Sequence, residues 1–345
     1  MDIEYTDSLQ SDGDSYVEYK MSGFNVFTSI GDNVEDSFGI TENKPYIYEN
    51  HSFLHSFFIN DDFSKITFWM KSGFDADDYL EPDYCEKPYI RGCEENADVV
   101  MFDAFREEQS GETKVTVWGQ AGSSFKTSQK DDLFSLRCKT LYPHYKTKVG
   151  MITILRNEIP LAAPWDKFYR GNFIRENNLR FSEELKVLDD MFFNYQVFSL
   201  VKRVVYFPDP LYHYCIWNGS ITNSYRADRP ELDQKAFEYI RKEILAADID
   251  NMREPYVLQA FYARVIKSFA ICCRLCFFND LNKKSQKEKL LAVKNYMKLD
   301  VYDNAFKKVR LSKIEWKLWL VTIAGRIKSP RLLYLLHMLQ NRKKV

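Results

Sequence analysis

The stretch that decides the fold class runs from residue 163 to residue 224 and reads APWDKFYRGNFIRENNLRFSEELKVLDDMFFNYQVFSLVKRVVYFPDPLYHYCIWNGSITNS. Helical patterns at 173–178 and 190–200 are followed by a run of β-branched and aromatic residues at 203–207, which predicts a strand. The sequence PDPLYHY at 208–214 predicts a turn into a further strand. Strands that alternate with helices are typical of an α/β layer fold.

The flanking segments extend this pattern in both directions. Residues 64–72 (SKITFWMKS) predict a buried strand, and residues 81–106 predict a helix followed by a short apolar strand. Beyond about residue 230, apolar residues recur at helical spacing, which predicts helices over 231–278 and 284–298. The chain is therefore expected to pass from an α/β part into a helical part.

A cluster of carboxylates follows the strand at 64–72: the sequence reads Asp75-Ala76-Asp77-Asp78. Carboxylates crowded at a strand end repel one another unless a cation relieves them. A hard divalent ion takes such oxygen ligands and neutralises a departing diphosphate. The alternative is a solvated acidic turn that caps the next helix.

These segments together resemble glycosyltransferase family 2, over about residues 64–225. In the first half the matching residues are Asp75, Asp77, Asp78, Tyr79, Leu80, Glu81, Pro82, Glu86, Asn96, Ala97, Asp98 and Val99. In the second half the matching segments are WDKFYR, ENNLRF, the acidic pair before FFNY, PLYHY and GSITNS. The resemblance implies a GT-A fold, in which helices flank a Rossmann-like mixed sheet, and transfer of a sugar from a nucleotide-sugar donor. We predict a GT-A-like domain over residues 1–228 and a helical C-terminal subdomain with a basic tail over 229–345.

The resemblance also implies roles for individual carboxylates. Asp75 and Asp77 would hold Mn²⁺ or Mg²⁺, and Asp78 would contact substrate. Asp190, beside Asp189, would be the general base that takes the proton of an acceptor hydroxyl, which implies inversion at the anomeric carbon. Asp189 has a second interpretation as the cap of the helix that begins there.

Three further residues are candidate substrate contacts. Trp165 and Lys167 match the "W-x-K" of the family near the acceptor side, where an aromatic face stacks on a sugar ring. His213 lies in "Y-H-Y" and would approach the diphosphate or the metal. The alternatives are core packing for Trp165 and a core or turn position for His213.

The first 63 residues depart from the family. Its opening strand "V-S-V-I-I-P-V-Y-N" and its "N-G-G-L-S-A-A-R-N" stretch have no good match, and SDGDS at 11–15 is the candidate remnant of the family's "D-D-G-S" loop. We expect this part to be truncated or divergent. Two alternatives follow: the chain is a catalytically inactive relative that serves as a binding or scaffold protein, or residues 1–63 are an unrelated replacement domain.

Charge and composition restrict the partners. The formal net charge of −1 gives no global field for nucleic acid. Residues 301–345 hold eleven Lys and Arg against two acids, and Trp316 and Trp319 lie among them. This composition predicts either a peripheral membrane contact, which suits a lipid-linked glycan acceptor, or an ordinary helical subdomain with a basic side.

The compartment is predicted from the cysteines and the first residues. The seven cysteines lack zinc-site spacing and are expected to be free thiols, buried where Cys272, Cys273 and Cys276 cluster. The sequence MDIEYTDSLQ carries no apolar run, so no signal peptide is expected. We predict a cytoplasmic protein, at the inner face of the membrane if the basic tail binds lipid.

Overall fold

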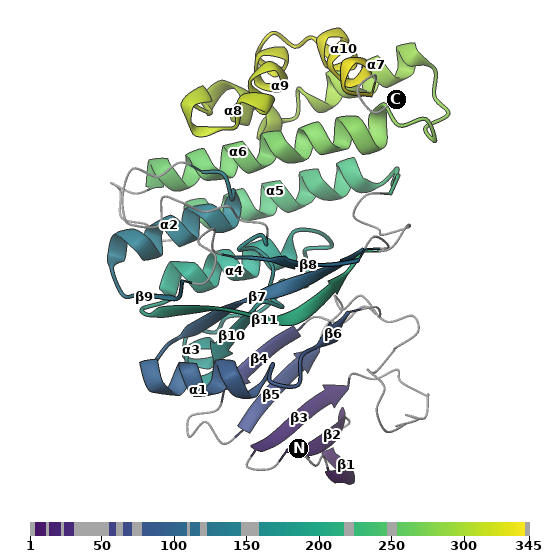
Figure 1. The fold of residues 1–345 in the computed structure, drawn as a ribbon. Helices are drawn as coiled ribbons and strands as arrows, with labels where there is room; N and C mark the ends of the chain where they lie inside the picture. Colours follow the sequence, from purple (N-terminus) through teal and green to yellow (C-terminus); the bar gives the residue numbers. More distant parts are fainter. Residues whose placement is uncertain are drawn as a thin grey trace. The chain divides into compact units, whose positions relative to one another are not determined.

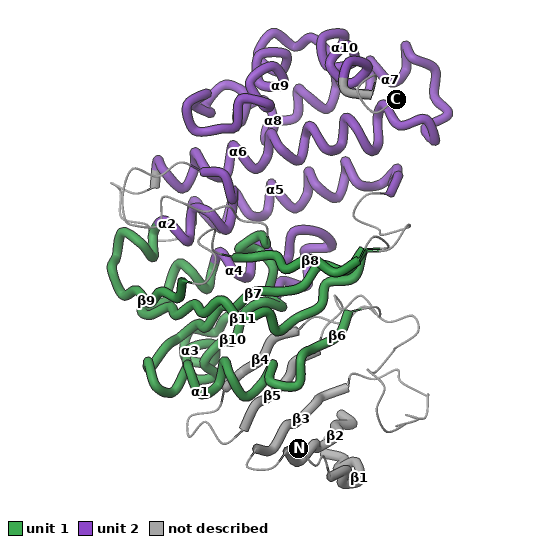
Figure 2. The backbone as a smooth tube through the Cα atoms, viewed as in Figure 1, with its two compact units in different colours: residues 1–134, 154–180, 196–217 green, residues 135–153, 181–195, 218–345 purple. Residues whose placement is uncertain are grey.

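A computed structural model describes the side chains of residues 78–108, 111–117, 123–145, 159–216, 224–246 and 255–339. For five strands before residue 71, for residue 254 and for residues 340–341 it describes the backbone alone. The chain divides into two compact units (Figure 2), and each unit gathers segments from several parts of the sequence. Unit 1 contains residues 1–134, 154–180 and 196–217, and unit 2 contains residues 135–153, 181–195 and 218–345.

Unit 1 is built on a mixed sheet, whose described strands follow the order β1-β2-β3-β5-β4-β10-β7-β11-β6, with β8 beside β7 and β9 beside β11 (Figure 1). The strands are β1 (Glu4–Ser11), β2 (Asp14–Met21), β3 (Phe24–Ile30), β4 (His55–Ile59), β5 (Lys65–Met70), β6 (Tyr79–Leu80), β7 (Val99–Glu108), β8 (Gly111–Val115), β9 (Phe125–Thr127), β10 (Lys167–Arg170) and β11 (Val204–Cys215).

Two long strands, β7 and β11, run parallel through this sheet and pair from Val99 to Glu107 of β7. Residues 99–104 of β7 are all buried, as is usual for a strand that is covered on both faces. β10 pairs with β7 in the antiparallel direction and with β4 in the parallel direction. The resulting sheet is mixed, and its parallel pair directs the carboxyl ends of β7 and β11 to one edge.

The described helices that lie wholly in unit 1 are α1 (Glu86–Glu95) and α3 (Gly171–Glu176), and α1 contacts β7, β10 and β11. α1 ends at Asn96, whose left-handed φ of 48° lets its backbone N–H bond back to the last turn. The next residues of the chain enter β7 directly, so the helix covers the strand that follows it.

Unit 2 is helical. Its helices are α5 (Arg229–Ala246), α6 (Glu254–Cys272), the π-helix Cys273–Phe277, α7 (Gln286–Tyr296), α8 (Asp300–Lys308), the short 3-10 helix Leu311–Lys313, α9 (Trp316–Arg326) and α10 (Pro330–Asn341). Two more helices, α2 (Lys130–Leu141) and α4 (Asp189–Leu200), contribute residues to both units.

An aromatic core holds the helices of unit 2 together. Phe269 of α6 lies against Tyr302 and Phe306 of α8, with ring centroids 5.6 and 5.0 Å apart. Gly325 of α9 allows a close approach, because an added Cβ would lie 2.2 Å from the Phe306 ring. α7 begins with a capping box between Ser285 and Glu288, as its sequence S-x-x-E dictates.

The predicted α/β class, with a helical part after it, is confirmed. One local prediction is wrong: PDPLYHY is part of the continuous strand β11 rather than a turn between two strands. The register of β11 against β7 shifts between Phe207 and Tyr212, so a bulge accommodates two prolines that cannot donate to the ladder. The domain boundary at residues 228 and 229 stays a prediction.

The seven cysteines are free thiols, as predicted, and Cys272, Cys273 and Cys276 are buried in unit 2. Burial raises the pKa of the Cys85 thiol to about 12, which keeps it protonated and unreactive at neutral pH. Within the described ranges, no helix has the length and apolar character that crossing a bilayer requires.

Candidate functional site

The candidate site lies in unit 1, at the edge where β7 and β11 end. Ligands of α/β sheets commonly bind outside the carboxyl ends of parallel strands. Here the ladder places His213 of β11 beside Phe105 of β7 and opposite Tyr79 of β6. The hairpin from β7 to β8 then places Glu112 opposite Glu107. Segments far apart in sequence thus converge on one histidine.

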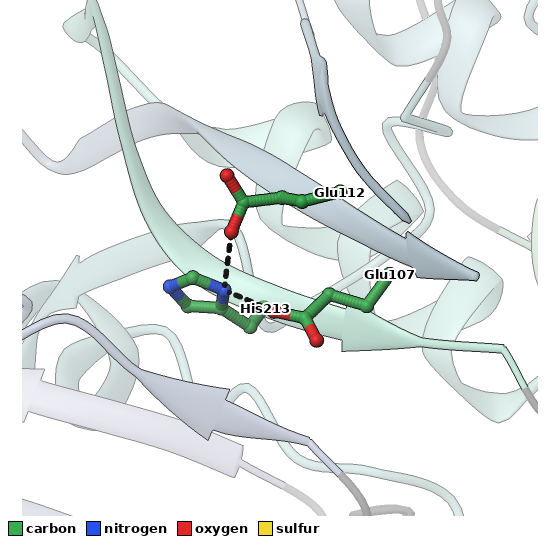
Figure 3. A group of neighbouring side chains, drawn as sticks. All are labelled: Glu107, Glu112 and His213. Carbon is green, nitrogen blue, oxygen red and sulfur yellow. Dashed lines mark hydrogen bonds and ion pairs between the residues drawn. The ribbon is translucent and has the colours of Figure 1, made fainter. Parts of the chain in front are cut away.

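His213 is 4% exposed, and carboxylates face both of its ring nitrogens. Nδ1 lies 2.8 Å from Glu107 Oε1, and Nε2 lies 2.8 Å from Glu81 Oε1. Glu112 approaches Nδ1 from β8, at 3.7 Å (Figure 3). Three carboxylates therefore surround one imidazole.

Two aromatic rings fix the plane of the imidazole. Tyr79 stacks on His213 with centroids 4.0 Å apart and an interplanar angle of 13°, and Phe105 lies on it at 4.7 Å and 30°. The Tyr79 hydroxyl donates to Glu107. Burial, and then the hydrogen bond to Glu107, raise the pKa of Tyr79, so the phenol stays protonated and acts as a donor.

The donor set fits a divalent cation. One ligand atom each from Glu107, Glu112 and His213 lies within 4.8 Å of the other two, the one such group in the part of the chain that the structure describes. Even a charged imidazole leaves the three carboxylates with a net charge of −2, which a cation would relieve. Carboxylate and imidazole together suit Mn²⁺, and Glu81 on Nε2 resembles the outer carboxylate that orients many metal-binding histidines.

Asp78, a predicted substrate contact, is buried next to this group. Its Oδ2 accepts a hydrogen bond of 2.6 Å from the Tyr212 hydroxyl, and its Oδ1 accepts one of 2.8 Å from the Cys215 backbone N–H. These contacts attach the start of β6 to the end of β11. The structure thus gives Asp78 an anchoring role, and its contact with substrate stays a prediction.

Trp165 belongs to the same region. Its half-buried ring stacks on Tyr212, with centroids 4.5 Å apart, and on Tyr214, at 5.7 Å. The Tyr84 hydroxyl donates to its carbonyl oxygen. Tyr212 therefore joins Trp165 to Asp78, so the structure brings three predicted residues, Asp78, Trp165 and His213, together around the end of β11. Stacking of Trp165 on a sugar stays a prediction.

Lys167 lies in the interior of unit 1. It is fully buried, and its ammonium donates to the Ala163 carbonyl oxygen at 2.6 Å and to the carboxylate of Asp166. Burial raises the pKa of Asp166 to about 6, against the opposing effect of Lys167. The ammonium thus holds the turn before β10 in place, and a direct contact of Lys167 with substrate stays a prediction.

Asp189 and Asp190 are the first residues of α4 and belong to unit 2. Negative charge in the first turn of a helix is favoured by the helix dipole, which agrees with the capping interpretation of Asp189. The Asn194 side chain donates to the Asp190 carbonyl oxygen at 3.3 Å. The role of Asp190 as general base stays a prediction. Asp75 and Asp77 lie outside the described residues, and Asp77 directly precedes Asp78 in the chain.

Glu107 and Glu112 were not predicted from the sequence to be site residues, and Glu81 was matched only as part of a motif. Glu107 and Glu112 flank a β7–β8 hairpin whose sequence, EEQSGE, contains a glycine with a φ of 124°. Such a turn between two acidic residues was the available signal, because a hairpin brings its two ends into register.

Sequence comparisons connect the chain to sugar-transferring enzymes. It is 28% identical over 154 residues to EpsH of Bacillus subtilis, whose name assigns it provisionally to the glycosyltransferases; the match covers 44% of this chain and 39% of EpsH. It is 26% identical over 120 residues to the poly(ribitol-phosphate) β-N-acetylglucosaminyltransferase TarS of Staphylococcus aureus, covering 35% of this chain and 21% of TarS. The chain thus matches less than half the length of either relative. No protein-family model matches it.

A comparison with solved structures also returns TarS. The crystal structure of TarS residues 1–349 in complex with UDP-GlcNAc aligns with 80% of this chain and 68% of that one. The TM-score is 0.48 and the sequence identity is 16%.

Proposed function

We propose that this chain is a glycosyltransferase that moves a sugar from a nucleotide-sugar donor to a glycan or lipid-linked acceptor in the synthesis of a surface polysaccharide. The observation that carries the proposal is the sequence match to two relatives with glycosyltransferase names, 28% identical over 154 residues in the longer case. TarS is named for the transfer of N-acetylglucosamine and has been crystallised with UDP-GlcNAc. A UDP-sugar is therefore the first donor to test.

We further propose that the chain is a family 2 enzyme with a GT-A fold. The resemblance of residues 64–225 supports this, as does a mixed sheet whose parallel strands β7 and β11 end at a polar edge. Chain connectivity adds support. Asp77 directly precedes Asp78, and the Asp78 carboxylate accepts a hydrogen bond from the Cys215 backbone N–H at the end of β11.

The proposed reaction depends on a divalent cation, Mn²⁺ or Mg²⁺. Asp75 and Asp77 would hold it, and His213 with Glu107 and Glu112 offers further ligands of suitable type. A bound cation would supply charge neutralisation for the nucleoside diphosphate as it leaves. The protein contributes the orientation of these ligands, through the Tyr79 and Phe105 rings and the Glu81 carboxylate.

Asp190 is proposed to remove the proton of the acceptor hydroxyl. A single base and in-line attack lead to inversion at the anomeric carbon. Asp190 lies in the first turn of α4, where the helix dipole favours negative charge, and an ionised carboxylate is the form that accepts a proton.

The donor site is tested by calorimetric titration with a panel of nucleoside diphosphates, with and without Mn²⁺. Asp77→Asn should abolish Mn²⁺-dependent nucleotide binding and leave the melting temperature nearly unchanged. Asp280→Asn, at an exposed position in unit 2, is the matched control and should bind like the wild type. Equal affinity in the Asp77→Asn and wild-type proteins would exclude Asp77 as a ligand.

The base is tested by steady-state kinetics with the donor that this panel identifies. Asp190→Asn should lower kcat by about 100-fold or more, the usual size of a general-base contribution, with little change in donor affinity. Asp189→Asn should change kcat much less, because the proposed base, Asp190, is still present. The opposite ranking of the two variants would transfer the role to Asp189.

A second proposal follows from the divergent first 63 residues, which do not match the family's opening strand. On this proposal the chain is an inactive relative that serves as a binding or scaffold protein. An inactive relative should show no binding of nucleoside diphosphates at millimolar concentration with Mn²⁺ present. An active enzyme should show saturable binding.

We also propose that the protein acts in the cytoplasm and contacts the inner face of the membrane through its basic C-terminal region. A lipid-linked acceptor would be presented at that surface.

A further inference from the structure

One helix of unit 2 exposes a continuous apolar stripe. Trp316, Leu320, Ile323 and Ile327 are spaced i, i+4, i+7 and i+11, along α9 and its first following residue, and so lie on one helical face. Their exposed fractions are 71%, 50%, 39% and 63%. Single exposed apolar residues are ordinary, but a contiguous row of large ones marks an interaction surface.

The stripe is not the face that α9 uses for folding. Leu318, Thr322 and Gly325 are buried on another face, and Gly325 packs tightly on Phe306 of α8. Trp319 is 44% exposed, and its Nε1 donates to the Leu311 carbonyl oxygen at 2.9 Å, which holds the ring at the surface. α9 is therefore anchored through one side and carries its apolar stripe on the other.

The neighbouring helix adds to the apolar surface of this region. α10 packs against both α7 and α9, and Leu333 on its inner side is buried. Its outer positions Leu335, Met338 and Leu339 are 53%, 40% and 49% exposed. The C-terminal region is thus a packed part of unit 2 with large apolar side chains outside.

The charge around the stripe indicates which kind of surface binds to it. Residues 316–345 contain seven Lys and Arg and no Asp or Glu. Among them Lys317, Arg326 and Arg331 are exposed within or beside the stripe. Each such charge is attracted to an anionic bilayer surface. A second copy of the same surface would instead bring like charges together, which is unfavourable in an apolar interface.

We propose that the stripe Trp316–Leu320–Ile323–Ile327 docks into the interface of an anionic lipid bilayer, with Trp319 and the flanking basic residues at the headgroups. Tryptophan is favoured at this depth, and leucine and isoleucine bury apolar area below it. The inference rests on the membrane contact proposed above, and it names the docking face and the lipid charge that this face needs.

The test measures co-sedimentation of the full chain with vesicles of phosphatidylglycerol and phosphatidylcholine, and with vesicles of phosphatidylcholine alone. The stripe variant is Trp316→Ser/Leu320→Ser/Ile327→Ser. Its matched control is Leu281→Ser/Leu291→Ser, at positions 62% and 58% exposed elsewhere in unit 2. We expect the wild type and the control to bind the anionic vesicles, and the stripe variant to bind at least tenfold less. Circular dichroism melting checks that all three proteins are folded.

Charge is tested separately with Lys317→Gln/Arg331→Gln at two exposed positions, which should weaken binding to anionic vesicles and bring it close to that on neutral ones. Arg326 is kept, because its guanidinium donates to the Phe306 and Val309 carbonyl oxygens. High salt should release the wild type only in part, because apolar burial is not screened. Equal binding of the wild type and the stripe variant would overturn the proposal. So would a wild type that binds neither vesicle, or a stripe variant that changes only from oligomer to monomer in light scattering.

Sugar transfer to a water-soluble acceptor provides the separating measurement. The stripe variant should retain the wild-type rate, since the stripe does not take part in the proposed catalysis. Absence of transfer in both proteins would count against the proposed enzyme alone, because vesicle binding needs no donor or acceptor.

Discussion

The two ends of the β7–β11 pair carry the same kinds of side chain and use them differently. At the amino end, Asp98 is 3% exposed; it accepts hydrogen bonds from the backbone N–H groups of Lys202 and Arg203, at 2.8 and 3.1 Å, and forms an ion pair with Arg170. One negative charge there meets one positive charge and two fixed donors. At the carboxyl end, three carboxylates meet a single histidine.

This difference separates a structural site from a ligand site within one pair of strands. A balanced, hydrogen-bonded carboxylate stabilises the chain entry to β7 and β11 and the end of β10, and needs nothing more. An excess of negative charge costs stability unless a cation is bound, and proteins keep such an excess where function uses it. Substitutions at the two ends should therefore differ in their effect on the free energy of unfolding.

Asp98→Ala should have the largest effect. It leaves the Arg170 guanidinium and two backbone N–H groups without their acceptor, and breaking such a buried pair costs about 3–5 kcal/mol. Urea unfolding followed by circular dichroism measures the loss. The control is Asp209→Ala, whose carboxylate is 45% exposed and pairs with Lys87 at 3.2 Å. A surface pair of that kind contributes about 1 kcal/mol or less. Similar losses in the two variants would contradict the structural role of Asp98.

The sequence predicts those strands and helices that are determined by residues close to one another along the chain. The strand within 64–72, the helix before ADVVMF and the helix that begins at Asp189 each follow from local periodicity and capping. The convergence of Glu81, Glu107 and Glu112 on His213 depends on parallel pairing of β7 with β11, whose paired residues lie about a hundred positions apart. Nothing in the local sequence specifies that pairing.

The burial of Lys167 was missed for a related reason. The "W-x-K" motif identifies a lysine near an aromatic residue, but only the folded turn shows that Asp166 and the Ala163 carbonyl oxygen take up its ammonium. The PDPLYHY segment failed because a bulge, which depends on the partner strand β7, lets a strand pass through two prolines. In the PDPLYHY segment, pairing with a distant strand thus overrode the local turn signal of the prolines.

We expect Asp166→Asn to have an intermediate effect on the free energy of unfolding, and this effect should depend on pH. Burial raises the pKa of this carboxyl from 3.8 to about 6 in the folded protein. Between these values the folded chain holds a proton that the unfolded chain has lost, so this group's contribution to stability falls as pH rises from about 4 to about 6. The free energy of urea unfolding should therefore decline less over that range in Asp166→Asn than in the wild type. Parallel pH profiles for the two proteins would show that Asp166 titrates normally.

Glu112→Gln should have the smallest effect on stability and the clearest effect on the affinity for a metal ion. The side chain is 49% exposed and approaches His213 only at 3.7 Å, so its change should alter the free energy of unfolding by about 0.5 kcal/mol or less. The same change removes one of three candidate ligands, and loss even of an outer partner weakens metal binding about 10- to 100-fold. Mn²⁺ titration followed by calorimetry should show at least a tenfold loss of affinity.

Glu108→Gln is the matched control for this variant. Glu108 follows Glu107 in β7, and successive residues of a strand point to opposite faces of the sheet, so Glu108→Gln should bind Mn²⁺ like the wild type. If Glu112→Gln and Glu108→Gln bind Mn²⁺ equally, the excess carboxylates at this end of the strands form an ion-pair network around His213 and hold no metal.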